Sequence, residues 1–135
     1  MQGAAKPLDL ATRESCLELG QVLDRIGDKW AVMVVGVLSR GPVRFNAIMR
    51  SIAGVSHRML TLTLRGLERD GLVKRTVYAT VPPKVEYQLS PLGQSLIQPL
   101  SVLSDWAAAN RAAIEAAREV FDQAQQDQDK VGGGR

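Results

Sequence analysis

The spacing of apolar residues predicts a short amphipathic helix near the middle of the chain. Three leucines have the i, i+4, i+7 spacing that lines one face of a helix over residues 57–70: Leu60, Leu64 and Leu67. The Ser56 hydroxyl can cap the start of this helix, and Gly71 can end it. The opposite face is mostly basic and hydrogen-bonding, which suits contact with phosphates and base edges in a DNA major groove.

A second helix is predicted just upstream, over residues 44–52. Its buried face would hold Phe45, Ile48 and Ile52, and Gly54 supplies the turn that separates it from the basic helix. Two helices joined in this way form a helix-turn-helix, in which the second helix enters the DNA groove.

Two short strands are predicted directly after the basic helix. Apolar and polar residues alternate over residues 73–78 and again over 85–89. Pro82 and Pro83 lie between them and cannot donate ladder hydrogen bonds, so this connection should be an exposed tip. A helix-turn-helix followed by such a hairpin is a winged helix.

The flanking segments predict further helices, over residues 15–26, 29–39 and 91–126, the last one interrupted or kinked near Pro99. The long C-terminal helix has more apolar surface than a small domain can cover, so we expect it to pair with a second copy of the chain. Candidate residues for this homodimer interface are Leu19, Leu103, Trp106, Ile114 and Val120.

The predicted fold class is therefore α+β, a winged helix-turn-helix with a two-stranded wing and N- and C-terminal dimerisation helices. One domain is expected over residues 15–126. A flexible segment would precede it at residues 1–14, and a disordered tail would follow at 127–135.

Charge is concentrated on the winged-helix segment. Residues 40–90 carry nine Lys and Arg against three Asp and Glu, a net charge of +6, whereas residues 1–39 sum to −1 and residues 91–135 to −2. This distribution is typical of a protein that binds double-stranded DNA. The residues expected to contact DNA are Arg44, Arg50, Ser56, His57, Arg58, Thr61, Arg65, Lys74, Arg75 and Lys84.

Several motifs together resemble the HxlR-type family of bacterial winged-helix transcription regulators, relatives of the MarR group. They are GDKWAVMVVGVL, GPVRFNAIMRSIAGVSHRMLTLTLRGLERDGLVKR and VPPKVEYQLSPLGQSL, in the family's order and spacing. The chain departs from the family pattern at Leu17, where proline is usual, and at Asp28, where glycine is usual. The resemblance implies a transcription regulator. We expect a dimeric repressor that binds an inverted-repeat operator.

Cys16 is the one cysteine of the chain, which excludes an internal disulfide and suits a reducing cytoplasm. Such a residue is most often a small buried hydrophobe. In several members of the resembled family, however, a cysteine at the start of the first helix senses oxidants or electrophiles. A helix N-terminus favours the thiolate, whereas Glu14, Glu18 and Asp24 oppose it. The sequence leaves both interpretations open, and with them a small-molecule or reactive effector.

The sequence lacks the motifs expected of an enzyme, a metal-binding protein or a membrane protein. The chain has one histidine, no nucleophile elbow, no phosphate loop and no metal-ligand spacing, so we expect neither an enzyme nor a bound metal or cofactor. No segment predicts a membrane span or a targeting signal, and a cytoplasmic location is expected. The alternative is a winged-helix domain that serves only as a protein-interaction module, without specific DNA binding.

Overall fold

In the computed structural model, which describes residues 12–132, helix α4 (His57–Arg69) buries the predicted leucine face. Leu60, Leu64 and Leu67 are each at most 1% exposed. The Ser56 hydroxyl accepts a hydrogen bond from the Met59 N–H at 3.0 Å, which caps the helix start. Gly71 has a φ of +77°, a left-handed conformation that favours glycine, and it ends the helix as predicted.

Two helices precede this region. Helix α1 (Arg13–Ile26) begins two residues earlier than predicted, because the Thr12 hydroxyl accepts from the Ser15 N–H and caps it. Helix α2 (Lys29–Leu38) is capped by Asp28, whose carboxylate accepts from the Trp30 N–H at 3.0 Å. Four of its side chains are buried in the core beside α4: Ala31, Val34, Val35 and Leu38.

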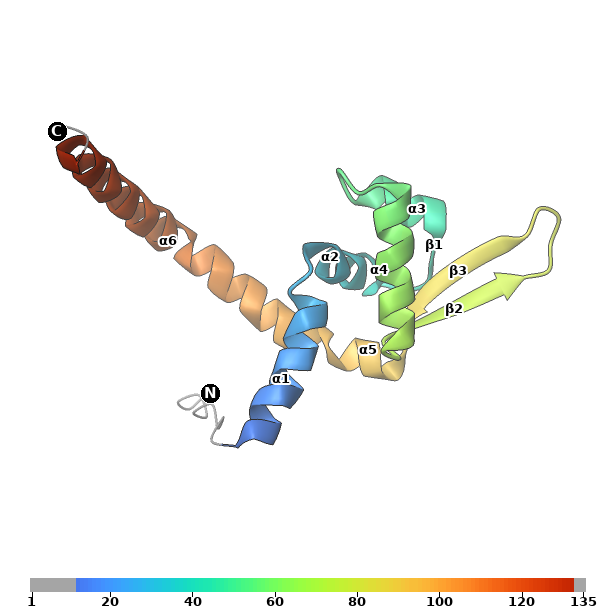
Figure 1. Ribbon diagram of the computed structural model, residues 1–135. Coiled ribbons are helices and arrows are strands. Elements are labelled where there is room, and N and C mark those ends of the chain that lie inside the picture. Colours follow the sequence, from blue (N-terminus) through green and yellow to red (C-terminus); the bar gives the residue numbers. More distant parts are fainter. Residues whose placement is uncertain (1–11, 133–135) are drawn as a thin grey trace. The chain divides into compact units, whose positions relative to one another are not determined.

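The wing strands are β2 (Val73–Tyr78), at its predicted bounds, and β3 (Lys84–Leu89), which begins one residue earlier than predicted; the two pair antiparallel. In Figure 1 this hairpin leaves the C-terminal end of α4 and extends away from the helices. Val81 at its tip is fully exposed, as expected for the proline-containing connection. The winged helix-turn-helix fold is thus confirmed.

A third strand escaped the sequence prediction. β1 (Val43–Arg44) pairs antiparallel with β3, which gives a sheet of order β1-β3-β2. Arg44 was assigned to the following helix, but it is extended and pairs with Glu86, so helix α3 covers Phe45–Ser51. A two-residue strand has no alternation to detect, and its partner strand lies more than forty residues further along the chain.

The C-terminal region holds α5 (Pro91–Ser95) and α6 (Ile97–Gly132), separated at Leu96. An interruption or kink was predicted near Pro99; the helix is interrupted just before it, at Leu96, and Pro99 itself lies in the first turn of α6. Proline is tolerated there, because its missing N–H would have had no helical partner. In one continuous helix, the N–H of residue 99 would donate to the Ser95 carbonyl oxygen. Proline has no N–H and cannot form this bond, which is consistent with the end of α5 at Ser95.

The terminal segments were predicted less well. α6 continues to Gly132, past the expected end at residue 126 and into the expected tail; the Gln123 side chain donates to Asp127 one turn later. At the other end, Arg13 and Glu14 are already helical, while residues 1–11 of the expected flexible segment lie outside the described range. The chain forms two compact units, residues 1–97 and 98–135, so α6 is considered by itself below.

Candidate nucleic-acid interface

The outer face of α4 presents the residues that the sequence assigned to DNA. His57, Arg58 and Arg65 are exposed, while the leucine face holds the helix in the core. Thr61 is half-buried, and its hydroxyl donates to the His57 carbonyl oxygen at 2.8 Å. The hydroxyl oxygen remains available as an acceptor. Ser56 is exposed but already serves as the cap.

Helix α3 fixes the first turn of α4. The ring of Phe45 lies 4.8 Å from that of His57, centroid to centroid, and 6.5 Å from that of Tyr87 on β3. Phe45 therefore packs between the sheet and the start of α4, the second helix of the helix-turn-helix and hence the candidate recognition helix. The sequence predicted Phe45 as a core residue, but not that it would touch a candidate DNA contact.

Three of the predicted cations surround one hollow. Arg44 from β1, Arg50 from the last turn of α3 and Lys84 at the start of β3 line a cavity of about 730 Å³ between α3 and the wing tip. Their side chains are exposed, and Asn46 lies in the same hollow. Such a group of cations attracts phosphate. The sequence predicted that each of these residues contacts DNA but could not show that they lie around one hollow.

Lys74 and Arg75 lie on opposite faces of β2, because successive side chains of a strand alternate. Arg75 is paired with the buried Tyr87, whereas Lys74 is on the face that also holds Lys84. Only one of the two can therefore act together with Lys84 on a single surface.

Tyr78 adds a polar contact near the wing tip that the sequence did not reveal. Its hydroxyl donates to the Glu86 carboxylate at 3.1 Å across the β2–β3 pair. This hydrogen bond and the negative charge of Glu86 raise the pKa of Tyr78 above its ordinary value, against an opposing effect of Arg44. Tyr78 is thus held as a neutral hydroxyl donor.

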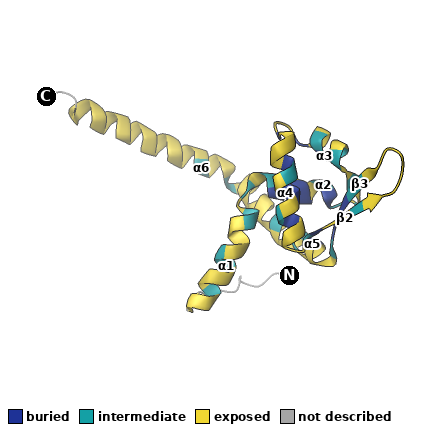
Figure 2. Cartoon of the chain, turned by 45° about the vertical axis from the view of Figure 1, so that its right-hand side comes forward, coloured by how far each residue is buried: buried dark blue, intermediate teal, exposed yellow. Residues whose placement is uncertain are grey.

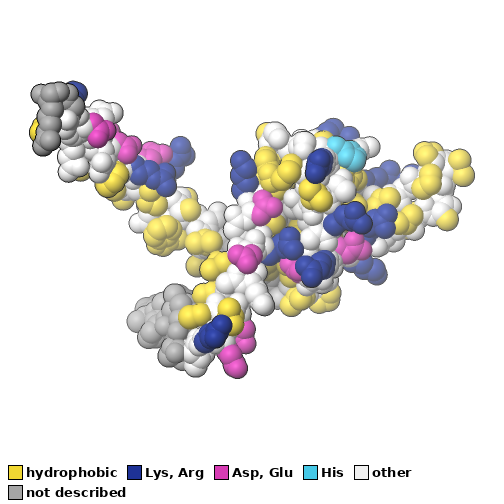
Figure 3. Space-filling view, viewed as in Figure 1, with side chains coloured by type: hydrophobic (Ala, Val, Ile, Leu, Met, Phe, Trp, Pro, Cys, Tyr) yellow, Lys and Arg dark blue, Asp and Glu magenta, His cyan; other side chains and the backbone are white. Residues whose placement is uncertain are grey.

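Basic side chains cluster over this region. In Figure 3 the dark blue Lys and Arg side chains gather, with the histidine in cyan, over the part of the molecule that holds α3, α4 and the wing. The surface therefore combines a projecting helix, a cationic hollow and a wing.

The residues predicted for dimerisation and sensing lie on α1 and α6. Leu19 is half-buried on α1, where Cys16 is exposed. On α6, Leu103, Trp106 and Val120 are more than half exposed. Ile114 is half-buried; no side chain of α6 is fully buried, and Figure 2 draws the helix almost entirely as exposed.

Comparison with known proteins assigns the chain to a family. The model for the HxlR-like helix-turn-helix matches residues 25–115, about two thirds of the chain. The chain belongs to the HxlR-like helix-turn-helix family. It is 38% identical over 99 residues to the uncharacterized HTH-type transcriptional regulator YtfH of Escherichia coli (strain K12), which covers 73% of this chain and 79% of YtfH.

Solved structures of other regulators share the fold. The redox regulator HypR in its reduced form superposes with a TM-score of 0.69 at 40% identity, over 73% of this chain and 98% of HypR. The reduced transcriptional regulator YodB of B. subtilis gives a TM-score of 0.62 at 31% identity, over 67% of this chain and 88% of YodB. As an HxlR-like protein, the chain is a transcriptional regulator.

The described residues form neither a membrane-spanning helix nor a metal-binding group. No helix within residues 12–132 is long and apolar enough to cross a membrane. The same part of the chain holds no group of three or more His, Cys, Asp or Glu side chains placed to bind a metal ion.

Proposed function

We propose that this HxlR-like protein is a sequence-specific DNA-binding repressor that acts as a homodimer on an inverted-repeat operator. The observation that carries the proposal is the arrangement of α4. Its leucine face is locked in the core, so Arg58 and Arg65 project from a fixed helix. The hollow around Arg44, Arg50 and Lys84 supplies phosphate contacts beside it.

The division of labour follows from the chemistry of these side chains. An arginine can donate two parallel hydrogen bonds to a guanine in the major groove, and each such pair discriminates by about 1–3 kcal/mol. A lysine or arginine on a phosphate adds affinity without sequence information. Arg58 and Arg65 are therefore assigned to base contacts, and the hollow to the DNA backbone.

Helix α6 supports the homodimer. Its apolar residues follow a seven-residue repeat, with pairs separated by three at Leu100 and Leu103, Ile114 and Ala117, and Phe121 and Ala124. Ala107 and Val131 continue the repeat singly, because Asn110 and Gln128 occupy the positions of their partners. This spacing is typical of a helix that pairs with another along a coiled-coil seam. A second copy of α6 would cover this stripe, together with the flanking Trp106 and Val120.

Repression requires only that the dimer block a promoter. Two recognition helices related by two-fold symmetry would read half-sites whose centres lie roughly 10 bp apart, one turn of DNA. No contact with the polymerase is needed for this mechanism.

A thiol-reactive effector is the proposed signal. HypR, a structural relative, is described as a redox regulator, and Cys16 of this chain is exposed on α1. With one cysteine per chain, oxidation would join Cys16 residues of two subunits or attach a small thiol, and an electrophile would form an adduct. A direct bridge needs the two Cα atoms within about 7 Å.

The deciding experiment is in vitro selection from a random duplex pool, followed by affinity measurements with salt titration. Enrichment of an inverted repeat, with a steep loss of affinity in salt, is the expected result. The interaction-module alternative predicts no enriched sequence and little salt-dependent binding, so either observation would overturn the repressor assignment.

A further inference from the structure

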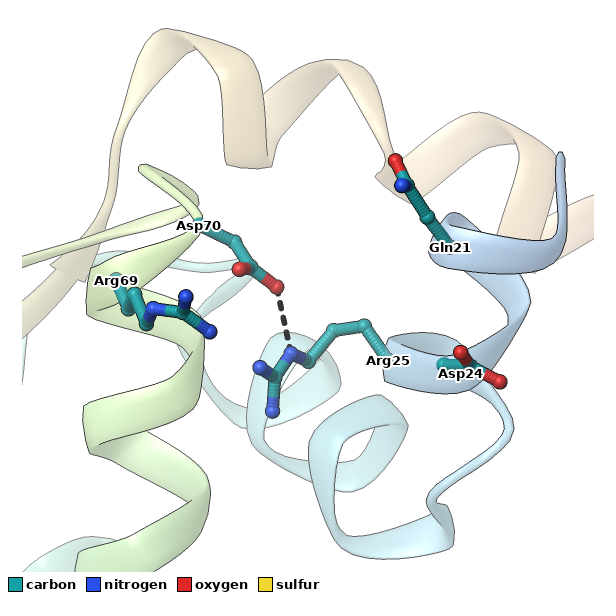
Figure 4. Close-up of a pocket in the computed structure, with 5 residues that line it drawn as sticks. All are labelled: Gln21, Asp24, Arg25, Arg69 and Asp70. Carbon is teal, nitrogen blue, oxygen red and sulfur yellow. Dashed lines mark hydrogen bonds and ion pairs between the residues drawn. The ribbon is translucent and has the colours of Figure 1, made fainter. Parts of the chain in front are cut away.

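An ion pair joins the end of α1 to the end of the recognition helix. The Arg25 Nε donates to the Asp70 Oδ2 at 2.6 Å, between residues 45 positions apart in sequence. Arg25 lies in the last turn of α1, and Asp70 is the C-cap of α4. Figure 4 shows the Arg25 side chain reaching from α1 toward Asp70 beside α4. The two side chains are 28% and 35% exposed, so the pair is only partly shielded from water.

The guanidinium of Arg25 also lies directly on the backbone of α4. A Cβ built on Gly66 would overlap this group, at 2.7 Å from the Arg25 Cζ. Glycine in the middle of a helix lowers helix stability, because its backbone is more flexible than that of alanine. At this position, the absence of a side chain makes room for Arg25, one turn before Asp70.

The surroundings indicate that this contact is not needed to hold the fold. Arg69, Asp24 and Gln21 line the same hollow, of about 530 Å³. Arg69 is exposed and lies next to Asp70 in sequence, so Asp70 keeps a cation nearby when Arg25 is removed. The leucine face of α4 is fully buried in the core, and we expect this burial to hold the helix in place when Arg25 is removed.

We propose that Arg25 is a positioning residue for the recognition helix. By seating its guanidinium on Gly66 and binding Asp70, it fixes the C-terminal end of α4 relative to α1. It thereby sets the angle at which α4 presents Arg58 and Arg65. The inference rests on the proposed function, in which α4 reads DNA.

The sharpest test is Gly66→Ala. The new methyl group expels the guanidinium, which is the end of a flexible side chain, while alanine favours the helix. We expect unfolding stability to stay equal or rise. Affinity for a duplex selected with the wild-type protein should fall about 2- to 30-fold, the range for changes that alter coupling between sites. Gly36→Ala on α2 is the matched control, since nothing lies within 4 Å of a Cβ there, and it should leave affinity unchanged.

Arg25→Ala should reproduce the loss of affinity, and Arg25→Lys should recover part of it. The slope of log affinity against log salt separates positioning from direct contact, because a lost phosphate contact lowers it by about one. A positioning residue leaves this slope unchanged. A lowered slope in Arg25→Ala would overturn the proposal and make Arg25 a DNA contact.

Two further results would also overturn the positioning role. One is wild-type affinity in both Gly66→Ala and Arg25→Ala, and the other is a loss of folding stability in Gly66→Ala that parallels the loss of affinity. If selection with the wild-type protein enriches no duplex, the DNA-binding function itself has failed and the positioning role falls with it. That outcome is distinct from normal binding by unaffected variants.

Discussion

The Ser90 hydroxyl donates a hydrogen bond to the Gly71 carbonyl oxygen at 2.6 Å, across 19 residues of sequence. Gly71 ends the recognition helix and Ser90 follows the last wing strand, so the wing leaves and returns to the same point. The Ser90 N–H donates to the Leu72 carbonyl oxygen at 3.0 Å, which doubles this link. The position of the wing relative to α4 is therefore fixed at its base, while its tip projects.

Ser90→Ala should lower the free energy of unfolding by about 1–2 kcal/mol, because it removes both this bond and the cap of α5, where Ser90 accepts from the Gly93 N–H. Urea denaturation measures the change. Ser95→Ala is the control, since its hydroxyl donates to Leu92 within its own turn. Equal stability of the two variants would contradict the role given to Ser90.

Arg58→Ala and Arg65→Ala should each weaken binding to the selected duplex by about 1–3 kcal/mol, if each contacts a base. Binding to a scrambled duplex should change much less, so specificity falls. Fluorescence anisotropy at fixed salt measures both. Arg13→Ala at the start of α1 removes the same charge and should retain specificity. Unchanged specificity in both α4 variants would reject this face as the reading surface.

Lys84→Ala should weaken binding to all duplexes alike, because a phosphate contact carries no sequence information. It should also lower the slope of log affinity against log salt by about one. A salt titration with selected and scrambled duplexes tests both points. A loss confined to the selected duplex would instead place Lys84 at a base edge.

Ile114→Asp should dissociate the homodimer, since it places a charge within the apolar stripe of α6. Sedimentation at micromolar concentration measures the change. Ala112→Asp introduces the same charge on the opposite side of the helix, where the side chain is exposed, and should remain dimeric. A monomeric wild-type protein, or two equally dimeric variants, would refute the interface.

Cys16→Ser should abolish any response of operator binding to a mild oxidant or a quinone. The thiolate is the reactive form of cysteine, and serine has no equivalent. Affinity is measured before and after treatment of both proteins. Identical responses of wild type and variant would show that Cys16 is not the sensor.

The sequence determined the winged-helix core because that information is local. The spacing of Leu60, Leu64 and Leu67, the cap at Ser56 and the turn at Gly71 each lie within a few residues of the element they define. The alternation in the wing likewise placed β2 at its observed bounds and β3 to within one residue. The net charge of residues 40–90 follows from the sequence alone.

Only the tertiary structure decided which distant residues meet. Strand β1 exists because its backbone pairs with β3, with Arg44 opposite Glu86. The cationic hollow exists because Arg50 of α3 and Lys84 of β3 line the same cavity. The contact between the Arg25 guanidinium and Gly66 cannot be predicted from the sequence, in which Gly66 is only a residue of low helix propensity within a predicted helix. Contacts between elements depend on how packed surfaces fit together in three dimensions, and periodicity along one segment carries no information about its partner.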